Sequence, residues 1–421
     1  MNNFMQQFMD QHAELTRRWF LRSSVLSAAA CGLSPLAANR FANASELSDA
    51  ISKLESFMTK PDDFRDVSRG TPLPHKLPDE KKNEVGLARQ SWRLEVISDP
   101  DKPAKLGRQL TVKGGTALDF DGLLKLAEKH AVRFPKVMTC LNIGCPLGMG
   151  IWEGVPMREV LWMTEPREDI RRVFYYGYHN NDPKQLFRSS LPVGRILEDP
   201  FDLPPVILCY KLNGQWLSSE RGGPVRVVVP EHYGFKSIKW LTTIVLSNLE
   251  HANDTYGEKN NDVDSPLKSF SAVLSAPKEV KPDTPFAITG YAQVGIASVK
   301  KVQLAIHNDR DELPDDDKYF SSLKWIDAET LGPPSDWGGG LTDGKIPANT
   351  LGFDSAGAPA AWPMRLCKVH WAAMLPGLPA GEYTLRSRTV DEKGIAQPMP
   401  RPFRKSGHAA IETVSFVVKA T

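Results

Sequence analysis

Hydrophobic and polar residues follow two different patterns along the chain, and the change of pattern divides it into two parts. Between residues 91 and 255, short apolar runs are mixed with amphipathic stretches, which is typical of an α+β domain. The Asn213-Gly214 pair predicts a turn that joins the last two strands of this part. The predicted strands are Trp92–Val96, Gln109–Val112, Val137–Cys140, Val206–Leu212 and Val225–Val229, and the predicted helices are Asp119–His130 and Met157–Met163.

The second part, residues 265–421, shows the two-residue alternation of half-buried strands. It follows the polar, charged stretch Asn253–Pro266, which we interpret as a linker. Residues 309–363, rich in Gly, Pro and Asp, interrupt it as a long insertion, and a structureless loop of that length predicts a position over a functional surface. The alternation predicts an immunoglobulin-like β-sandwich with strands at Phe286–Tyr291, Val299–His307, Tyr383–Val390 and Thr413–Val418.

The N-terminus has the pattern of an export signal. Adjacent arginines in Thr16–Arg22 precede a modest apolar segment at Ser23–Ala38, and Ala42-Asn43-Ala44 has the small-residue spacing of a cleavage site. Together they predict a twin-arginine signal peptide over residues 1–44 and therefore a periplasmic protein. A basic amphipathic N-terminal helix is the alternative. The polar, proline-punctuated residues 45–90 are then expected to form an extended leader that wraps the next domain.

Length and charge narrow the class of protein. A chain of 421 residues with 41% hydrophobic content is long enough for two or three globular domains. It contains no run of 18 apolar residues, so we expect no membrane span in the mature chain. The signal contains four of the 52 basic and two of the 50 acidic residues, which leaves 48 of each. Such a balance argues against nucleic-acid binding, which needs basic residues gathered on one face.

Five cysteines bear on the redox and metal chemistry of the chain. Cys31 belongs to the signal, and the other four, Cys140, Cys145, Cys209 and Cys367, could form two disulfides in an exported protein. Cys209 lies in an apolar strand pattern, where a buried free thiol is common. The chain has no Cys-x-x-Cys-His motif, so we expect no haem on it, and it has no zinc-type Cys-x-x-Cys pair.

The stretch Gly222–Leu241 combines a buried strand with an excess of cations. Three consecutive valines closed by Pro230 mark the strand. Between residues 218 and 241 the only acids are Glu220 and Glu231. Because an unpaired charge is costly once it leaves water, the cations here predict an anionic partner. These cations are Arg221, Arg226, Lys236 and Lys239.

This stretch resembles the signature of the sulfite oxidase family of molybdopterin enzymes, in which an arginine and a Lys-Trp pair hold the anionic cofactor. The order of strand, Cys140, glycine-containing loop and Trp152–Met157 resembles the molybdenum-ligand segment of that family. The resemblance implies that the Cys140 thiolate binds molybdenum together with the two dithiolene sulfurs of molybdopterin. Cys145 is the alternative ligand if the loop register differs. A buried core cysteine and a Cys140–Cys145 disulfide are the other interpretations.

The match is longest over residues 186–241, and it implies the contacts with the cofactor. Arg221 stands where the family commonly has histidine, and it can still donate to an anion. His179 falls near a common aspartate position, although it could equally be a surface histidine. Phe187 stands where vertebrate and plant members have an active-site tyrosine. In having phenylalanine here, the chain resembles the bacterial sulfur-oxidation type instead. The cofactor-binding residues implied by the resemblance are His179, Arg221, Arg226, Ser237, Ile238 and Lys239, with backbone groups of Ser237 and Ile238 as phosphate donors.

Two further arginines are implied by weaker matches. Asp66–His75 resembles the family's Arg-Asn-His-x-Pro-x-Pro stretch with Arg69 one place away from the family arginine, and Arg69 is the candidate for contacts with cofactor and substrate. A solvated loop arginine is the alternative reading of Arg69. Arg388–Gly394 resembles the C-terminal ending of the family, after which Arg404, or else Arg401, would reach over the metal.

The chain departs from the family at one informative place. Many members follow the ligand cysteine with Ala-Gly-Asn-Arg, where the arginine helps to bind the substrate anion. Here Leu141–Cys145 follows, and no arginine occurs before Arg158. One oxyanion contact is therefore missing or supplied from elsewhere. This weakens the assignment of sulfite as substrate more than the assignment of molybdenum.

The resemblance implies an exported molybdenum-molybdopterin oxidoreductase that oxidises sulfite to sulfate by oxygen-atom transfer. Without a haem motif on this chain, a separate periplasmic cytochrome is expected to accept the electrons, and a homodimer is expected through the C-terminal domain. Two alternatives stay open. One is a reductase of sulfoxides or other oxyanions on the same scaffold, and the other is a cofactor-free exported binding protein that kept the fold.

Overall fold

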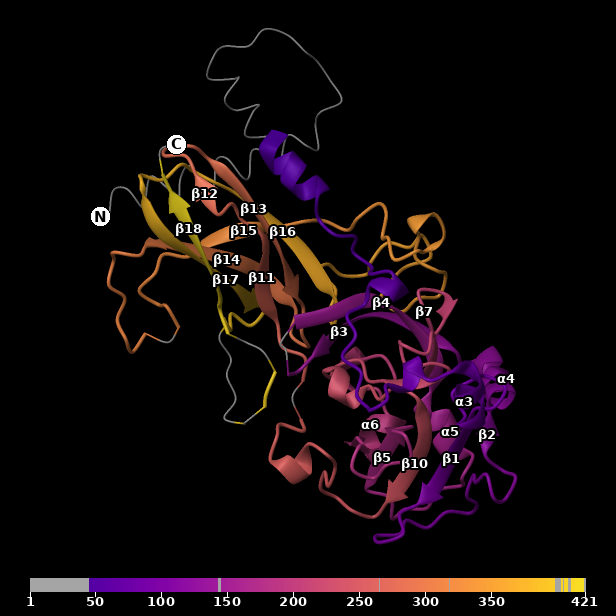
Figure 1. Ribbon diagram of the computed structural model, residues 1–421. Coiled ribbons are helices and arrows are strands. Elements are labelled where there is room, and N and C mark those ends of the chain that lie inside the picture. Colours follow the sequence, from indigo (N-terminus) through magenta and orange to yellow (C-terminus); the bar gives the residue numbers. More distant parts are fainter. Residues whose placement is uncertain are drawn as a thin grey trace.

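The computed structural model describes residues 45–142, 145–264, 266–317, 319–397, 403, 405–407 and 410–419. Figure 1 shows two β-rich bodies, which meet where the end of β3 approaches the strands of the C-terminal body. The predicted signal peptide, Arg401 and Arg404 lie outside the described residues. Within the described part of the chain, no helix is long and apolar enough to cross a membrane.

Two five-stranded sheets form the N-terminal body. The first has the order β2-β1-β10-β5-β6, in which β1 and β10 run parallel and the other pairs run antiparallel. The second has the order β3-β4-β7-β8, and β9 also pairs with β7. The bounds are β1 Arg93–Ser98, β2 Leu118–Asp119, β3 Val132–Cys140, β4 Cys145–Pro156, β5 Arg172–Gly177, β6 Arg188–Pro192, β7 Ile207–Leu212, β8 Gln215–Trp216, β9 Arg226–Val228 and β10 Leu241–Ser247.

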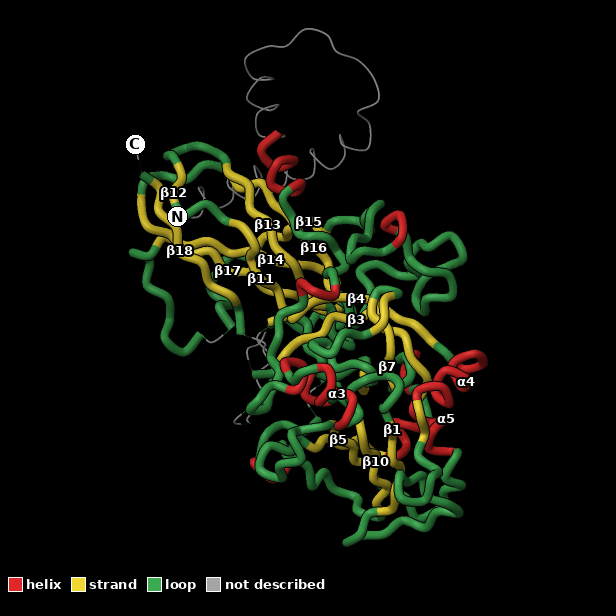
Figure 2. Tube along the Cα trace, turned by 45° about the vertical axis from the view of Figure 1, so that its right-hand side comes forward, coloured by secondary structure: helices red, strands yellow, loops and turns green. Residues whose placement is uncertain are grey.

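Short helices cover the edges of these sheets, which confirms the mixed α+β class (Figure 2). The Asp119 side chain accepts a hydrogen bond from the backbone N–H of Gly122 at 2.8 Å and so caps α4, as acids at a helix start do. The α-helices are α3 Asp79–Glu84, α4 Phe120–His130, α5 Met157–Trp162 and α6 Val193–Leu197, and residues 45–52 are also helical. The 3-10 turns are η1 Pro61–Asp63, η2 Pro74–Lys76, η3 Pro200–Asp202, η4 Gly234–Lys236, η5 Gly257–Lys259 and η6 Thr342–Gly344.

The C-terminal body is a β-sandwich with the strand order β11-β13-β16-β15-β14-β17-β18-β12. Its two layers are joined by β15, whose first residues pair with β14 and whose last two pair with β16. All four strands predicted from the alternation are confirmed as β13, β14, β17 and β18. The bounds are β11 Phe270–Ser275, β12 Glu279–Val280, β13 Phe286–Gln293, β14 Val299–Asn308, β15 Ile326–Thr330, β16 Lys368–Leu375, β17 Gly381–Asp391 and β18 Glu412–Val418.

Two local predictions are wrong. The segment Gln109–Val112 is a loop that touches β1 through a single bridge between Leu110 and Val96, because its other backbone groups bond within their own turn and to side chains. The Asn213-Gly214 turn joins β7 to the short β8 and not to β9. Both β8 and β9 pair with β7, and the detour between them carries Arg221 toward the interior.

The insertion at residues 309–363 packs against the leader, residues 45–90. It contains β15, so it is not structureless, and Trp337 from it is buried edge-on against Phe57 with 5.0 Å between the ring centroids. The backbone N–H of Met58 donates to the Trp337 carbonyl at 2.7 Å. Phe57, Met58 and Trp337 thereby belong to the core of the N-terminal body. The leader therefore packs against both bodies, since Leu47 is buried against β16 residues Ala372 and Met374.

Candidate active site

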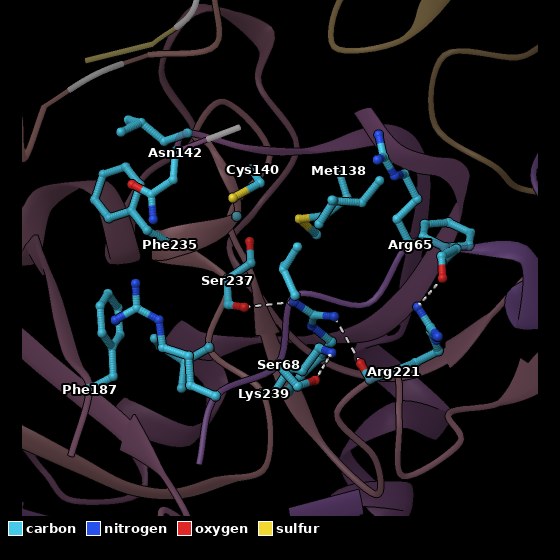
Figure 3. A pocket seen from close by; sticks show the side chains of 18 of the residues that line it. Arg65, Ser68, Met138, Cys140, Asn142, Phe187, Arg221, Phe235, Ser237 and Lys239 are labelled. Carbon is cyan, nitrogen blue, oxygen red and sulfur yellow. Dashed lines mark hydrogen bonds between the residues drawn. The ribbon is translucent and has the colours of Figure 1, made fainter. Parts of the chain in front are cut away.

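One pocket of the N-terminal body collects the residues that the sequence singles out. It lies between the leader, the end of β3, and the β9–β10 segment (Figure 3). Figure 3 shows Cys140 at one end of this pocket and Arg221 and Lys239 at the other, with Ser237 between them. The predicted site residues that line it are Arg69, Cys140, His179, Phe187, Arg221, Arg226, Ser237, Ile238 and Lys239.

Two buried arginines form the floor of the pocket. Arg221 and Arg226 are 3% and 5% exposed. Arg226 donates to the backbone carbonyls of Arg221 and Ser237 at 2.8 and 2.6 Å, and Arg221 donates to the carbonyl of Phe64 at 2.8 Å and to Glu220. The Nε atom of each guanidinium has no hydrogen-bond partner among the described residues. Burial, with help from the like charge of Arg221, lowers the pKa of Arg226 to about 10.

Lys239 lies beside these arginines and bridges the leader to β10. Its Nζ donates to Asp66 at 3.0 Å, to Ser68 at 2.7 Å and to the carbonyl of Glu220 at 2.7 Å. Burial and the charge of Arg226 lower the pKa of Lys239 to about 8, against the attraction of Asp66. Burial opposes ionisation of Asp66, but the hydrogen bond from Ser68 and the Lys239 charge outweigh it and lower its pKa to about 2.

The expected shortage of acids is therefore only partly right. Asp66 is remote in sequence, yet it pairs with Lys239. Lys236 is fully buried and points away from the pocket, with its Nζ donating to the Ser190 carbonyl at 2.7 Å and lying 3.7 Å from Asp254. Glu231 pairs with Arg195 outside the predicted stretch. After these pairings, Arg221 and Arg226 remain the buried cations whose donors are not all used.

Cys140 ends β3 at the other end of the pocket. It is a half-buried free thiol, and the β3–β4 register places residue 145 opposite it. Thr139 donates through its hydroxyl to the Gln293 side chain of β13, which ties this end of β3 to the sandwich. The arrangement exposes one sulfur to the pocket from a strand that is anchored on both sides.

Ser237 offers a different donor from the one expected. Its backbone N–H donates to the carbonyl of Gly234 at 3.0 Å, and its hydroxyl oxygen accepts from the backbone N–H of Val229 at 3.1 Å. The hydroxyl hydrogen, and not the backbone N–H, is therefore what Ser237 presents to a ligand. This corrects the prediction that its backbone group is the phosphate donor.

Phe187, Phe235 and Tyr256 form an aromatic wall of the pocket that Cys140 lines. The Arg69 guanidinium lies over the Phe187 ring, 4.8 Å from its centroid. Tyr256 meets Phe187 edge-on at 5.6 Å and stacks on Phe235 at 4.4 Å, between ring centroids. Arg69 is exposed and lines the pocket, so it can supply the positive charge that is missing from the loop after Cys140.

His179 is a buried member of the pocket, which rules out the surface interpretation. Its Nδ1 lies 2.9 Å from the carbonyl oxygen of Gly177. Because a carbonyl only accepts, Nδ1 carries a proton, and in the neutral ring Nε2 is an acceptor. Burial, with help from the charge of Arg69, lowers the pKa of His179 and favours this neutral form.

Comparison with known proteins assigns most of the pocket-lining residues to a known domain family. The family described as oxidoreductase molybdopterin binding domain matches residues 87–255, which contain the cysteine and the cation-rich segment. Residues 87–255 therefore form a molybdopterin-binding oxidoreductase domain, and the chain is similar to enzymes of the sulfite oxidase type. Over 245 residues it is 28% identical to the protein-methionine-sulfoxide reductase catalytic subunit MsrP of Ralstonia nicotianae, covering 56% of this chain and 69% of that protein.

A second relative and one solved structure are also similar to this chain. Mitochondrial sulfite oxidase of Drosophila melanogaster is 27% identical over 198 residues, which cover 42% of this chain and only 32% of that enzyme. The sulfane dehydrogenase SoxCD of Paracoccus pantotrophus shares the fold, with a TM-score of 0.54, 17% sequence identity and coverage of 80% of this chain and 79% of that one. At 17% identity the likeness to SoxCD concerns the fold alone.

The chemistry of the pocket-lining residues fits molybdopterin. Molybdopterin carries a phosphate and two dithiolene sulfurs, and it needs buried cations at one end and a soft metal ligand at the other. The unpartnered Nε atoms of Arg221 and Arg226 and the Nζ of Lys239 would hold the phosphate end. Cys140 would supply the thiolate at the metal end.

Several residues that line the pocket were not predicted from the sequence. Arg65 and Ser68 come from the leader, which the sequence marks only as polar and proline-punctuated. Trp152 lies in the predicted metal-ligand segment, where Arg226 packs over its ring at 5.3 Å from the centroid. Tyr256 belongs to the stretch that we interpret as a linker, so that interpretation is wrong for this residue. The one sequence signal available for Tyr256 was an aromatic residue within a polar stretch.

The pKa of Lys239 predicts how anion binding to the cofactor-free protein depends on pH. Lys239 is charged below its folded pKa of about 8 and loses the charge above it. We therefore expect sulfate affinity, measured by calorimetry, to fall above pH 8 with a slope approaching about one log unit per pH unit. Sulfate keeps its charge throughout, so the change belongs to the protein.

The stability of the cofactor-free fold changes with pH in the direction opposite to sulfate affinity. Between pH 8 and the ordinary lysine pKa of 10.5, the unfolded chain holds a proton that folded Lys239 has lost. The cofactor-free fold therefore gains stability from this residue as pH rises through that range. Lys239→Arg is the matched control, because arginine stays charged and should flatten the affinity profile. An unchanged profile in Lys239→Arg would show that another group titrates.

Proposed function

We propose that this protein is an exported molybdopterin-dependent oxidoreductase that oxidises sulfite, or a related small sulfur oxyanion, by oxygen-atom transfer. The observation that carries this is the position of Arg69, whose guanidinium lies on Phe187 in the pocket that Cys140 lines. It supplies a cation for the substrate at the metal end, while Arg221, Arg226 and Lys239 are committed to the opposite end.

Some of the pocket-lining residues would hold the cofactor, and others would position the substrate. When bound, the molybdenum centre supplies the two-electron chemistry of oxygen-atom transfer. The overall change converts sulfite and water to sulfate, two protons and two electrons. Arg69 attracts the oxyanion, and the aromatic wall of Phe187, Phe235 and Tyr256 provides an apolar side of the pocket beside it. Neutral His179 offers an acceptor nitrogen in the same pocket.

A sulfoxide reductase is the second candidate, and two observations favour it. The aromatic wall suits an apolar thioether product, and the loop after Cys140 lacks the family arginine at its described positions, Leu141 and Asn142. One relative of this chain is a protein-methionine-sulfoxide reductase catalytic subunit. The reaction would run in the other direction, with sulfoxide, two protons and two electrons giving thioether and water.

One set of measurements separates these candidates. The full chain is purified after expression in a molybdopterin-competent host, and molybdenum is counted by elemental mass spectrometry. We expect about one metal per chain, then sulfite-dependent reduction of cytochrome c or ferricyanide. Turnover of methionine sulfoxide with a reduced dye, and none of sulfite, would replace the proposal by the second candidate. A metal content near zero, with other molybdenum enzymes of the host loaded, would favour the cofactor-free binding protein.

Export, electron acceptor and assembly are parts of the same proposal. The arginine pair at residues 17 and 18 and the segment that follows support periplasmic export, and cell fractionation of the intact chain tests it. The lack of a haem-attachment motif supports a separate cytochrome as electron acceptor. A homodimer through the sandwich is the expected assembly, and light scattering on the purified protein decides between one and two copies.

A further inference from the structure

Tyr256 is held in the pocket by contacts at both ends of its side chain. The buried Asp254 carboxylate accepts hydrogen bonds from the backbone N–H groups of Tyr256 and Gly257 at 3.1 and 3.0 Å. The same carboxylate accepts from the Ser190 hydroxyl at 2.8 Å and lies 3.7 Å from Lys236. This buried network fixes the backbone from which the tyrosine projects.

The ring of Tyr256 is fixed as well. Phe235 stacks on one face with an interplanar angle of 13°, and Phe187 meets the ring edge-on. The turn itself is tight, because a Cβ atom on Gly257 would lie 1.9 Å from the carbonyl oxygen of Ala252. A side chain restrained in this way loses little further freedom when it binds a ligand.

The Tyr256 hydroxyl lies where the substrate is expected. It donates to the Asn142 side-chain oxygen at 3.0 Å, two residues beyond Cys140. Both Tyr256 and Arg69 contact the ring of Phe187, so they meet at one part of the pocket. Burial raises the pKa of Tyr256, and the nearby charge of Arg69 opposes this, so the phenol keeps its proton at neutral pH.

We propose that Tyr256 is a substrate-positioning residue, whose hydroxyl donates a hydrogen bond to an oxygen of the sulfur oxyanion that Arg69 attracts. The proposal rests on the proposed oxidation of sulfite. Asn142 holds the hydroxyl while the pocket lacks substrate, and rotation about the phenol C–O bond redirects the hydrogen to the anion. Phe187 cannot provide this donor, because it has no hydroxyl.

The test compares Tyr256→Phe with Asn142→Ala in the molybdenum-loaded enzyme, with activity expressed per bound metal. Tyr256→Phe keeps the ring and removes the donor, so we expect KM for sulfite to rise roughly tenfold with kcat within about twofold, as for one hydrogen bond to a charged group. Asn142→Ala removes the resting acceptor but keeps the donor, so KM should stay the same or fall. Tyr383→Phe, whose hydroxyl donates to a carbonyl in the sandwich at 3.1 Å, is the matched control.

A structural role gives a different result. If the Tyr256–Asn142 bond only braced the loop, both variants would lose it and both would change KM and thermal stability alike, which would overturn the proposal. Sulfate affinity of the molybdenum-loaded proteins, measured by calorimetry, provides a readout without turnover, and it should fall in Tyr256→Phe alone. If the wild type does not oxidise sulfite, the proposed function fails first, while the calorimetric comparison still decides whether Tyr256 binds an oxyanion. Unchanged sulfate affinity in Tyr256→Phe would show that the Tyr256 hydroxyl does not bind an oxyanion.

Discussion

Cys140→Ala is expected to lower turnover by more than about 100-fold, the upper range for losing a residue that only supports a metal ligand. Cys140 is a pocket-lining thiol that the described structure leaves unpaired, at the end where a soft donor is needed. Without it, a bound molybdenum would depend on donors carried by the cofactor. Sulfite oxidation per bound metal, together with the metal and pterin content of the purified variant, measures the effect.

Two other cysteines supply the controls. Cys145→Ala tests the alternative ligand at the start of β4, and it should leave turnover within a few-fold of the wild type. Cys209→Ala removes a fully buried thiol whose pKa burial raises to about 12, so it should cost stability and not metal. Loss of metal from Cys145→Ala, with normal turnover in Cys140→Ala, would transfer the ligand role to Cys145.

The sandwich shows which strands can be predicted from sequence. β14, β17 and β18 have polar residues that are exposed or half-buried on at least part of one side, so their alternation is visible. β13 is almost wholly buried, and it could be predicted because apolar residues alternate with small or polar ones at its start. β16, Lys368–Leu375, is buried at every position, so it shows no alternation of apolar and polar residues over its full length, and Lys368 and His370 interrupt its apolar character at the start. Its Lys368 is neutralised by Glu55 of the leader, a contact that no local pattern reveals.

The candidate site also depends on contacts between distant segments that no local sequence pattern reveals. The cations between residues 221 and 239 could be predicted to serve an anion, because they surround one strand that is apolar enough to be buried. Their internal partners could not be predicted, because Lys239 pairs with Asp66, 173 residues away. The β3 cysteine, the leader and Tyr256 converge only through tertiary packing, which fixes the pocket and leaves no periodic signal in the sequence.

Close backbone contacts also shape the phosphate end of the pocket. Gly222 has φ of 97°, and a Cβ atom there would lie 2.7 Å from the Lys239 side chain. A Cβ atom on Gly177 would lie 2.0 Å from the Lys239 carbonyl oxygen. These glycines let β5, the Arg221 detour and Lys239 approach one another, so the cations are held by backbone that tolerates no side chain.

Arg226→Ala is expected to abolish retention of the cofactor, with metal and pterin content falling more than about tenfold. Arg226 is buried, lines the pocket, donates to two backbone carbonyls and has an Nε–H without a partner among the described residues. Its loss removes the charge that opposes the cofactor phosphate, and it leaves the carbonyls of Arg221 and Ser237 without that donor. The unpaired carbonyls cost about 1–3 kcal/mol each, so the cofactor-free fold should also melt at a lower temperature.

Three comparisons separate cofactor binding from folding in this experiment. Arg226→Lys keeps the charge but cannot span both carbonyls, so it should retain part of the cofactor. Arg158→Ala removes a half-buried arginine paired with Asp199 at 2.8 Å away from the pocket, and it should retain all of it. In the cofactor-free proteins, sulfate should raise the melting temperature of the wild type more than that of Arg226→Ala. A fully loaded Arg226→Ala enzyme would mean that Arg226 serves the fold and that Arg221 and Lys239 alone hold the phosphate.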